Sequence, residues 1–150
     1  MGRLRKVLVL GMVLLPVLTE AKDIYVPGSY TTIQAAVNAA NNGDTIYVSA
    51  GTYNEVVSIN KGIALVGNGT PTITASGLGY TNAVIFDGNA TNNASISGFK
   101  ITGATESWPN GSGIYCTNGS PTINHNTISK NGNYGILCNS SSPSITNNTI

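Results

Sequence analysis

The second half of the chain repeats itself with a period of about 22 residues, and this repeat restricts the possible folds more than any other feature. Segment 113–123 aligns without a gap with segment 135–145, and the same offset continues to the Asn-Thr-Ile triplets that end at Ile128 and Ile150. Self-similarity at such a period is typical of arrays in which one unit cannot bury its apolar side chains alone. The repeat therefore predicts a stack of similar coils.

Each repeat unit holds three short apolar clusters separated by Asn, Gly, Ser and Pro. In one unit these clusters are Ile123, Ile128 and segment 136–138. Alternation places Ile136 and Cys138 on one face of a strand and Leu137 on the other. Three short strands joined by turns describe one coil of a parallel β-helix. The predicted fold class is therefore all-β, a solenoid of single-stranded coils of about 22 residues each.

Stacked coils bring equivalent residues into register at a spacing of about 4.8 Å. We expect two aliphatic ladders inside the tube, formed by Ile96, Ile123 and Ile145 and by Ile101, Ile128 and Ile150. Asn126 and Asn148 would stack at a corner, where their amides bond to neighbouring coils. A leucine-rich repeat has a similar period, but Leu is too scarce here. A β-sandwich would need hairpins and longer strands.

The composition excludes several other classes of protein. Only 9% of the residues are charged, the formal net charge is +1, and 18 residues are Gly. Helical bundles and coiled coils need many Glu, Lys and Leu residues. Disordered chains lack the Ile, Val and Thr that recur throughout this one. With no basic stripe, no nucleic-acid partner is expected.

Residues 1–21 have the layout of a signal peptide. Arg3, Arg5 and Lys6 precede the apolar stretch 7–18, and Thr19, Glu20 and Ala21 follow it. A membrane-spanning helix needs about 20 apolar residues, so an uncleaved anchor is the less favoured alternative. We expect a secreted protein, extracellular or periplasmic, with no membrane attachment after cleavage. The remaining chain has no Arg and a net charge of −1.

The next segment has the pattern of a capped end. Residues 23–27 predict a first strand, 32–41 show helical spacing of Ile33, Ala36, Val37 and Ala40, and 45–48 return to strand alternation. A short amphipathic helix would cover the open end of the tube. We therefore divide the chain into a cap with first strands (22–56) and β-helix coils (57–150). Because no cap follows Ile150, we expect the chain to be the N-terminal part of a longer β-helix.

Four motifs give the chain a family resemblance. They are Thr-Ile-Gln-Ala-Ala-Val-Asn-Ala-Ala (32–40), Gly-Asp-Thr-Ile-Tyr-Val (43–48), Gly-Thr-Tyr-Asn-Glu (51–55) and Leu-Val-Gly-Asn-Gly (65–69). Residues 23–150 thereby resemble the pectin lyase-like superfamily, which includes pectinesterases, pectate lyases, polygalacturonases and secreted β-helix proteins. The resemblance implies a right-handed parallel β-helix. These motifs build the cap and the first coils of that fold and carry no catalytic residue.

No catalytic constellation is predicted in this segment. The resemblance implies that a lyase would need an Arg base with a calcium-binding acidic cluster, and a pectinesterase two Asp and an Arg, none of which assembles here. Glu106 lies nearly one coil beyond Asp87 and could approach it, but isolated carboxylates are usually surface residues. His125 is the only His and does not make a metal site with two Cys. No cofactor is expected.

Aromatic residues are the candidates for carbohydrate binding. Trp108, beside Glu106, lies in a loop that makes the spacing from Ile96 to Ile123 longer than that from Ile123 to Ile145. An exposed indole could stack on a sugar ring, or it could fold back over a neighbouring coil. Tyr115 points outward and could extend a sugar platform or belong to ordinary packing of the sheet surface.

Cys116 and Cys138 occupy equivalent positions one coil apart. A secreted protein permits a disulfide between them, but parallel Cβ vectors disfavour its torsion. We expect a ladder of buried free thiols. Asn-x-Ser/Thr sequons also recur, as expected of Asn-rich turns, and they matter only where secreted proteins are glycosylated. They begin at Asn68, Asn89, Asn93, Asn110, Asn118, Asn139 and Asn147.

Two functional hypotheses follow. The first is a non-catalytic secreted β-helix that binds polysaccharide or serves as an extracellular scaffold, which fits uncharged faces with occasional aromatic residues. The second, from the family resemblance, is the N-terminal part of a polysaccharide lyase, esterase or hydrolase acting on uronate polymers, with catalytic residues beyond Ile150.

Overall fold

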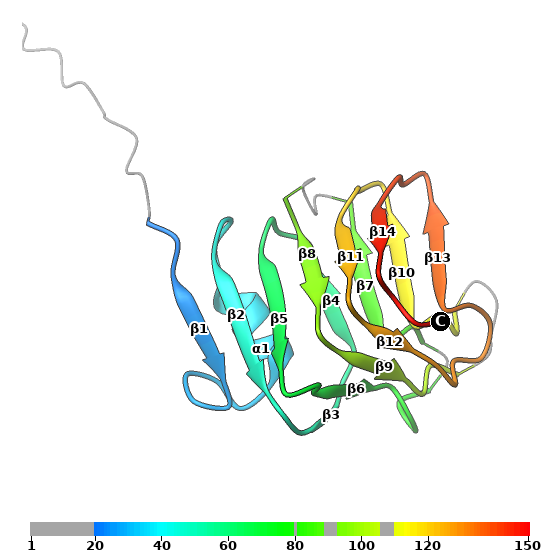
Figure 1. Cartoon of the computed structure of the whole chain (residues 1–150), viewed down its shortest axis with the longest axis horizontal. Helices are drawn as coiled ribbons and strands as arrows, with labels where there is room; N and C mark the ends of the chain where they lie inside the picture. Colours follow the sequence, from blue (N-terminus) through cyan, green and yellow to red (C-terminus); the bar gives the residue numbers. More distant parts are fainter. Residues whose placement is uncertain (1–19, 80, 89–92, 106–109) are drawn as a thin grey trace, which may run out of the picture.

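The computed structural model describes residues 20–79, 81–88, 93–105 and 110–150. Nearly all of the predicted signal peptide (1–19), and also Trp108 and Glu106, lie outside the described residues. The described chain forms short strands and one helix (Figure 1). That helix is too short to cross a membrane, and the described residues contain no other candidate for a spanning helix.

The strands form three parallel sheets, which we call A, B and C. Sheet A contains β1 (Asp23–Val26), β2 (Thr45–Ser49), β5 (Ala64–Asn68), β8 (Ser95–Ser97), β11 (Thr122–Asn124) and β14 (Ser144–Thr146). Sheet B contains β3 (Thr52–Asn54), β6 (Thr72–Thr74), β9 (Lys100–Thr102) and β12 (Thr127–Ile128). Sheet C contains β4 (Val57–Ile59), β7 (Val84–Asp87), β10 (Ile114–Thr117) and β13 (Ile136–Asn139).

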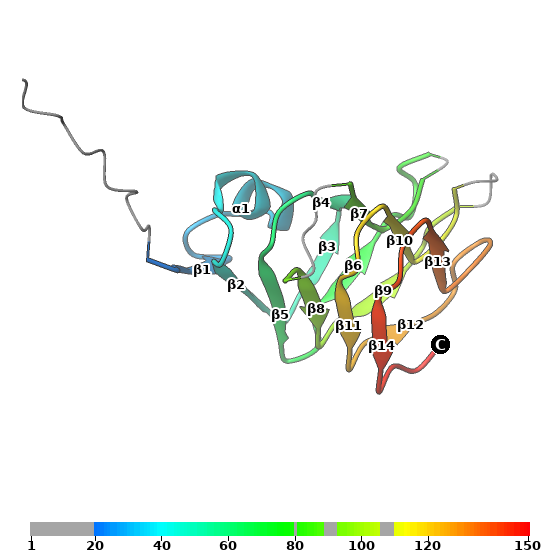
Figure 2. The same cartoon turned by 90° about the horizontal axis from the view of Figure 1, so that it is seen from above.

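The chain visits the three sheets in turn, so each circuit is one coil stacked on the last. From β2 it runs through β3 and β4 and returns to sheet A at β5, and later circuits repeat this order. The view from above shows the sheets arranged around a common interior, with the helix α1 (Ile33–Ala39) beside β1 and β2 (Figure 2). This all-β arrangement is consistent with the predicted parallel β-helix.

Coil length varies along the stack. The register pairs Ile24 with Ile46 at one end and Ile123 with Ile145 at the other, and both pairs have the sequence offset of the C-terminal repeat. Between these ends Leu65 pairs with Ile46 at a shorter offset and with Ile96 at a longer one. A uniform coil length is therefore not observed, because the turns between the strands differ in length.

Alternation along each strand fills the interior with aliphatic side chains. The predicted ladder of Ile96, Ile123 and Ile145 is present in sheet A, and Ile101 pairs with Ile128 in sheet B. The inner members are fully buried, whereas Ile145 is 43% exposed, since β14 has no strand on its outer side among the described residues. Burial of this kind stabilises each coil only when a neighbour covers it.

Buried asparagines close the corners of the coils. The Asn126 Nδ2 donates to the Ile96 and Asn124 carbonyls (3.1 and 2.9 Å), and its Oδ1 accepts from the Phe99 amide (3.1 Å). The Oδ1 of Asn148, in the next coil, accepts from the Asn126 backbone amide (2.9 Å). The predicted asparagine ladder is thus present, and it satisfies backbone groups that leave the sheet at each bend.

The coils hold the helix α1 at both ends. It covers the interior with Ile33, Ala36 and Val37. The Glu55 carboxylate accepts from the first helical amides, at Ile33 and Gln34 (2.9 and 2.8 Å). The Lys61 ammonium donates to three carbonyls at the other end (2.7 to 2.9 Å). So short a helix is not stable alone, and these charges complement the partial charges at its ends.

Candidate functional site

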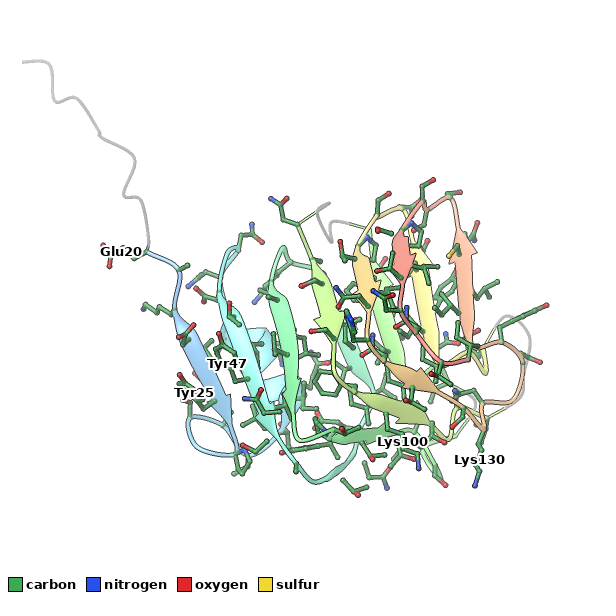
Figure 3. The ribbon with its side chains drawn as sticks, in the orientation of Figure 1. Glu20, Tyr25, Tyr47, Lys100 and Lys130 are labelled. Atoms are coloured by element: carbon green, nitrogen blue, oxygen red, sulfur yellow. The ribbon has the colours of Figure 1, made fainter. Side chains whose placement is uncertain are left out.

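Tyr25 and Tyr47 stack on the outward face of sheet A. They are register partners on β1 and β2, with ring centroids 5.5 Å apart and planes inclined by 20°. Tyr25 is 51% exposed. Both project from neighbouring strands at the N-terminal end of the stack, far from Lys100 and Lys130 (Figure 3). We call this stacked pair the Tyr25–Tyr47 platform.

The local sequence explains why both rings point outward. Each Tyr stands in the middle of an Ile-Tyr-Val triplet, and the flanking Ile and Val side chains are buried. Since successive side chains of a strand alternate between faces, the Tyr between them must face solvent. The two triplets are separated by one period of the C-terminal repeat. That coincidence is the signal in the sequence that could have revealed the pair, which was not among the predicted site residues.

Apart from Asp23 at the end of the stack, the rest of this outward face is small and uncharged, and most of it is polar. The row that continues the Tyr25–Tyr47 platform holds Val66, Ser97, Asn124 and Thr146. The row beside it holds Thr45, Ala64, Ser95, Thr122 and Ser144. From β2 to β14 the strands of sheet A present no charged side chain, in contrast to sheet B, where Lys100 is exposed. Such a face offers hydroxyls, amides and an aromatic ring.

Tyr115 lies on a different face. It points outward from sheet C, half-buried between its register partners Ile85 and Leu137. The Asn139 Nδ2 donates to its hydroxyl (3.3 Å). The structure therefore does not bring Tyr115 together with the Tyr25–Tyr47 platform.

The structure does not test whether Asp87 and Glu106 approach one another, because Glu106 lies outside the described residues. Asp87 is exposed at the end of β7, and its register partner is Thr117. In the part of the chain that the structure describes, no three His, Cys, Asp or Glu residues gather in a way that could hold a metal ion. A hollow of about 400 Å³ beside sheet A is lined by amides and backbone, from Asn42, Gly43, Gly62, Ala64 and Asn93. None of these residues titrates, so they offer neither an acid nor a base.

Cys116 and Cys138 are register partners and both are free thiols. Cys116 is buried, but Cys138 is exposed on the outer strand β13, so the expected ladder of two buried thiols is wrong for Cys138. Burial raises the pKa of Cys116 to about 12, and the charge of Cys138 adds to the shift. Burial also raises the pKa of Cys138, against the lowering effect of a hydrogen bond with Cys116. Neither thiol is an activated nucleophile.

Comparison with known proteins gives two matches. A protein-family profile described as "Protein of unknown function (DUF1565)" matches residues 61–150. A cell surface glycoprotein of Methanothermus fervidus is 32% identical over 112 residues, which are 73% of this chain and 17% of that protein. The chain thus spans less than a fifth of the length of that relative. No solved structure matches.

Proposed function

Because the chain belongs to the DUF1565 family, whose function is unknown, we propose a function from its own geometry. We propose that the protein is a secreted or cell-surface β-helix. It binds polysaccharide through the outward face of sheet A and does not cleave it. The name of the M. fervidus relative supports a surface location. The signal-peptide pattern of residues 1–21 supports export.

The Tyr25–Tyr47 platform is the observation that carries this proposal. The C–H face of a sugar ring packs on the face of an aromatic ring, and tyrosine adds a hydroxyl at its edge. Tyr25 is large and half-exposed, although burying it would stabilise the fold. Tyr134 is similarly exposed but has no stacked neighbour among the described residues, whereas Tyr25 and Tyr47 form a stacked aromatic surface, and a sugar supplies the matching chemistry.

The uncharged rows beyond the platform suit an extended neutral ligand. Ser97, Asn124 and Thr146 follow Tyr47 and Val66 at the strand spacing of about 4.8 Å. A polysaccharide chain lying across the strands would meet a new hydroxyl or amide at each coil from β8 onward. With no Lys or Arg on these strands, phosphate or sulfate groups would find no counter-charge.

We propose no catalysis for the described residues. Hydrolysis of a glycosidic bond needs two carboxylates at a defined separation, and Asp87 faces Thr117 across the strands. The alternative, an enzyme of the lyase, esterase or hydrolase type, rests on the family resemblance alone. It is an outcome that the experiment below distinguishes.

We also propose that the parallel β-helix winds with a right-handed turn. The chain would then be a distant relative of the pectin lyase-like superfamily. The supporting features are the motif of residues 32–40 at the cap and the three parallel sheets visited in turn. An experimental structure would test the handedness directly, and a left-handed coil would overturn this assignment.

Binding to an array of neutral and uronate polysaccharides tests the function. We expect binding that weakens about tenfold in Tyr25→Ala and in Tyr47→Ala, since one aromatic contact contributes roughly 1.4 kcal/mol. Tyr134→Ala is the matched control, because Tyr134 is 46% exposed but lies outside the platform. Tyr115→Ala reports whether the outward face of sheet C contributes, and Trp108→Ala tests the residue predicted from the sequence. Absence of binding, or equal affinity of both platform variants and wild type, would refute the proposal.

The same samples are assayed for unsaturated products, new reducing ends and released methanol. Any of these products would replace the non-catalytic proposal with the enzyme alternative. Silence in all three, together with binding, is the result we expect.

A further inference from the structure

Two structural sets stand out among the asparagines of this protein. In the first set the side chains are buried or half-buried, and their amides bond to neighbouring coils: Asn82, Asn126, Asn131 and Asn148. None of these four has Ser or Thr two positions later. In the second set the side chains are exposed and each begins an Asn-x-Ser/Thr sequon: Asn68, Asn93, Asn118, Asn139 and Asn147.

The two sets differ in what a linked glycan would do to the fold. The first set stands in the same Ser- and Thr-rich turns as the second, and Asn148 directly follows Asn147. Five of the six sequons in the described residues begin at an exposed asparagine; the exception is Asn110, which is half-buried and bonds to Asn82 of a neighbouring coil. A sugar linked to Asn126 would break the bonds that close its corner, whereas one linked to Asn118 would not.

We propose that Asn68 and Asn118 are acceptors of N-linked glycans. Asn68 ends β5 on the outward side of sheet A, and its side chain makes no hydrogen bond within the described residues. Thr70, two positions on, is exposed in the turn that follows. Asn118 is exposed in the turn after β10, and its Nδ2 donates only to the adjacent Thr117 hydroxyl (3.2 Å) among the described residues. Both side chains can carry a large group without loss of a contact between coils.

The reaction is a group transfer from a lipid-linked sugar donor. The amide nitrogen of Asn attacks the anomeric carbon, the new N–C bond forms, and the bond from that carbon to the phosphate oxygen of the lipid breaks. The phosphate leaves with the electron pair, and the amide proton passes to a base of the transferase. Nothing is oxidised or reduced. Because the chain meets this donor only on export, the inference rests on the proposed secreted or surface location.

Asn110 provides an internal contrast. It also begins a sequon, but its Oδ1 accepts from the buried Asn82 amide (3.4 Å), and the Asn82 Oδ1 in turn accepts from the Ser112 backbone amide (2.8 Å). Ser112, whose hydroxyl a transferase must reach, is completely buried. A glycan on Nδ2 would leave the Asn110 Oδ1 free to accept this bond, but the buried Ser112 hydroxyl is out of reach of a transferase in the folded coil, so we expect this sequon to stay unmodified.

The test is glycopeptide mass spectrometry of the full chain purified from its own organism, together with fractionation of the cells. We expect a glycan on the peptides that contain Asn68 and Asn118 and an unmodified Asn110. Asn68→Gln and Asn118→Gln should each remove one glycan from the intact mass. Thr70→Val should remove the same glycan as Asn68→Gln while it keeps the asparagine. Asn60→Gln, at an exposed asparagine outside any sequon, should change no glycan.

The failures are distinguishable. An exported protein with unmodified Asn68 and Asn118 overturns this inference and leaves polysaccharide binding standing. A glycan on Asn110 overturns the burial argument. A protein that stays inside the cell with residues 1–21 attached overturns both the inference and the proposed function. If a Gln variant fails to fold, the peptide map of the wild-type protein still shows whether Asn68 and Asn118 carry glycans, and Thr70→Val still tests the Asn68 sequon.

Discussion

Replacing Asn126 by Ala should destabilise the fold more than any other single change to a polar side chain at a corner. Asn126 is 2% exposed and bonds to coils on both sides. Its removal leaves the Phe99 amide and the Ile96 and Asn124 carbonyls without their partner. Water cannot replace the amide freely at a site this deeply buried.

The Asn126→Ala substitution should lower the free energy of unfolding by about 3–5 kcal/mol. Each buried backbone group left without a partner costs about 1–3 kcal/mol, and the Asn124 carbonyl, which is only partly buried, contributes at the low end. The total free energy of unfolding of a domain is about 5–15 kcal/mol. At roughly 2–4 °C per kcal/mol for a chain of this size, the Tm should fall by about 10 °C.

Urea unfolding followed by far-UV circular dichroism measures this loss. The matched control is Asn124→Ala, two positions away, where the side chain lies on the outward face of β11 and only the backbone carbonyl bonds to Asn126. Asn126→Asp should be at least as damaging as Asn126→Ala at neutral pH, since a carboxylate cannot donate to the two carbonyls. If Asn126→Ala lost no more stability than Asn124→Ala, the corner asparagine would not stabilise the coils as argued.

Three further changes test other parts of the fold. Lys61→Met keeps the aliphatic stem but loses three hydrogen bonds to the end of α1, and it should lower the free energy of unfolding in urea by about 2 kcal/mol. A change below about 0.5 kcal/mol would show that these three bonds do not hold the helix. Gly98→Ala should cost more than about 1 kcal/mol, because Gly98 has φ +80° and its new Cβ would lie 2.5 Å from the Gly67 carbonyl oxygen. An unchanged urea midpoint of Gly98→Ala would refute the expected clash with the Gly67 carbonyl oxygen. Since burial raises the pKa of Cys116 from 9.0 to about 12, the unfolded thiol deprotonates first. Its contribution to stability is therefore complete below pH 9 and lost between pH 9 and 12, by at most about 1.4 kcal/mol per pH unit. Cys116→Ala should remove this part of the alkaline loss, and thiol labelling should modify Cys138 well before Cys116.

Local patterns in the sequence predicted the interior well. The constant offset of the repeat placed Ile123 over Ile145 and Asn126 over Asn148, because strands that repeat without insertion must stack with equivalent residues in register. Helical spacing predicted α1, and Thr32 is its N-cap, with its hydroxyl accepting from the Ala35 amide (3.2 Å). In each case the informative residues lie close together or at a fixed period.

Other features depended on pairings that no local pattern reveals. Leu65 pairs with Ile46 and Ile96 at unequal distances along the chain, since turns absorb insertions without disturbing strand alternation. Glu55 and Lys61 have no local pattern that reveals their role, but they hold the two ends of a helix that lies well before them in the sequence. The candidate site was predicted around Trp108 and Tyr115, whereas the exposed stacked pair is formed by Tyr25 and Tyr47.

By itself, the sequence determined that this chain stacks short β-coils around aliphatic and asparagine ladders, because a repeated pattern of inward Ile and corner Asn has only that way to bury its apolar side chains and satisfy its backbone. Only the tertiary structure decided which outward residues meet. Outward side chains carry no burial requirement, so the repeat period could suggest that Tyr25 meets Tyr47, but only the structure shows that the two rings stack and that Asn68 and Asn118 are exposed at the surface.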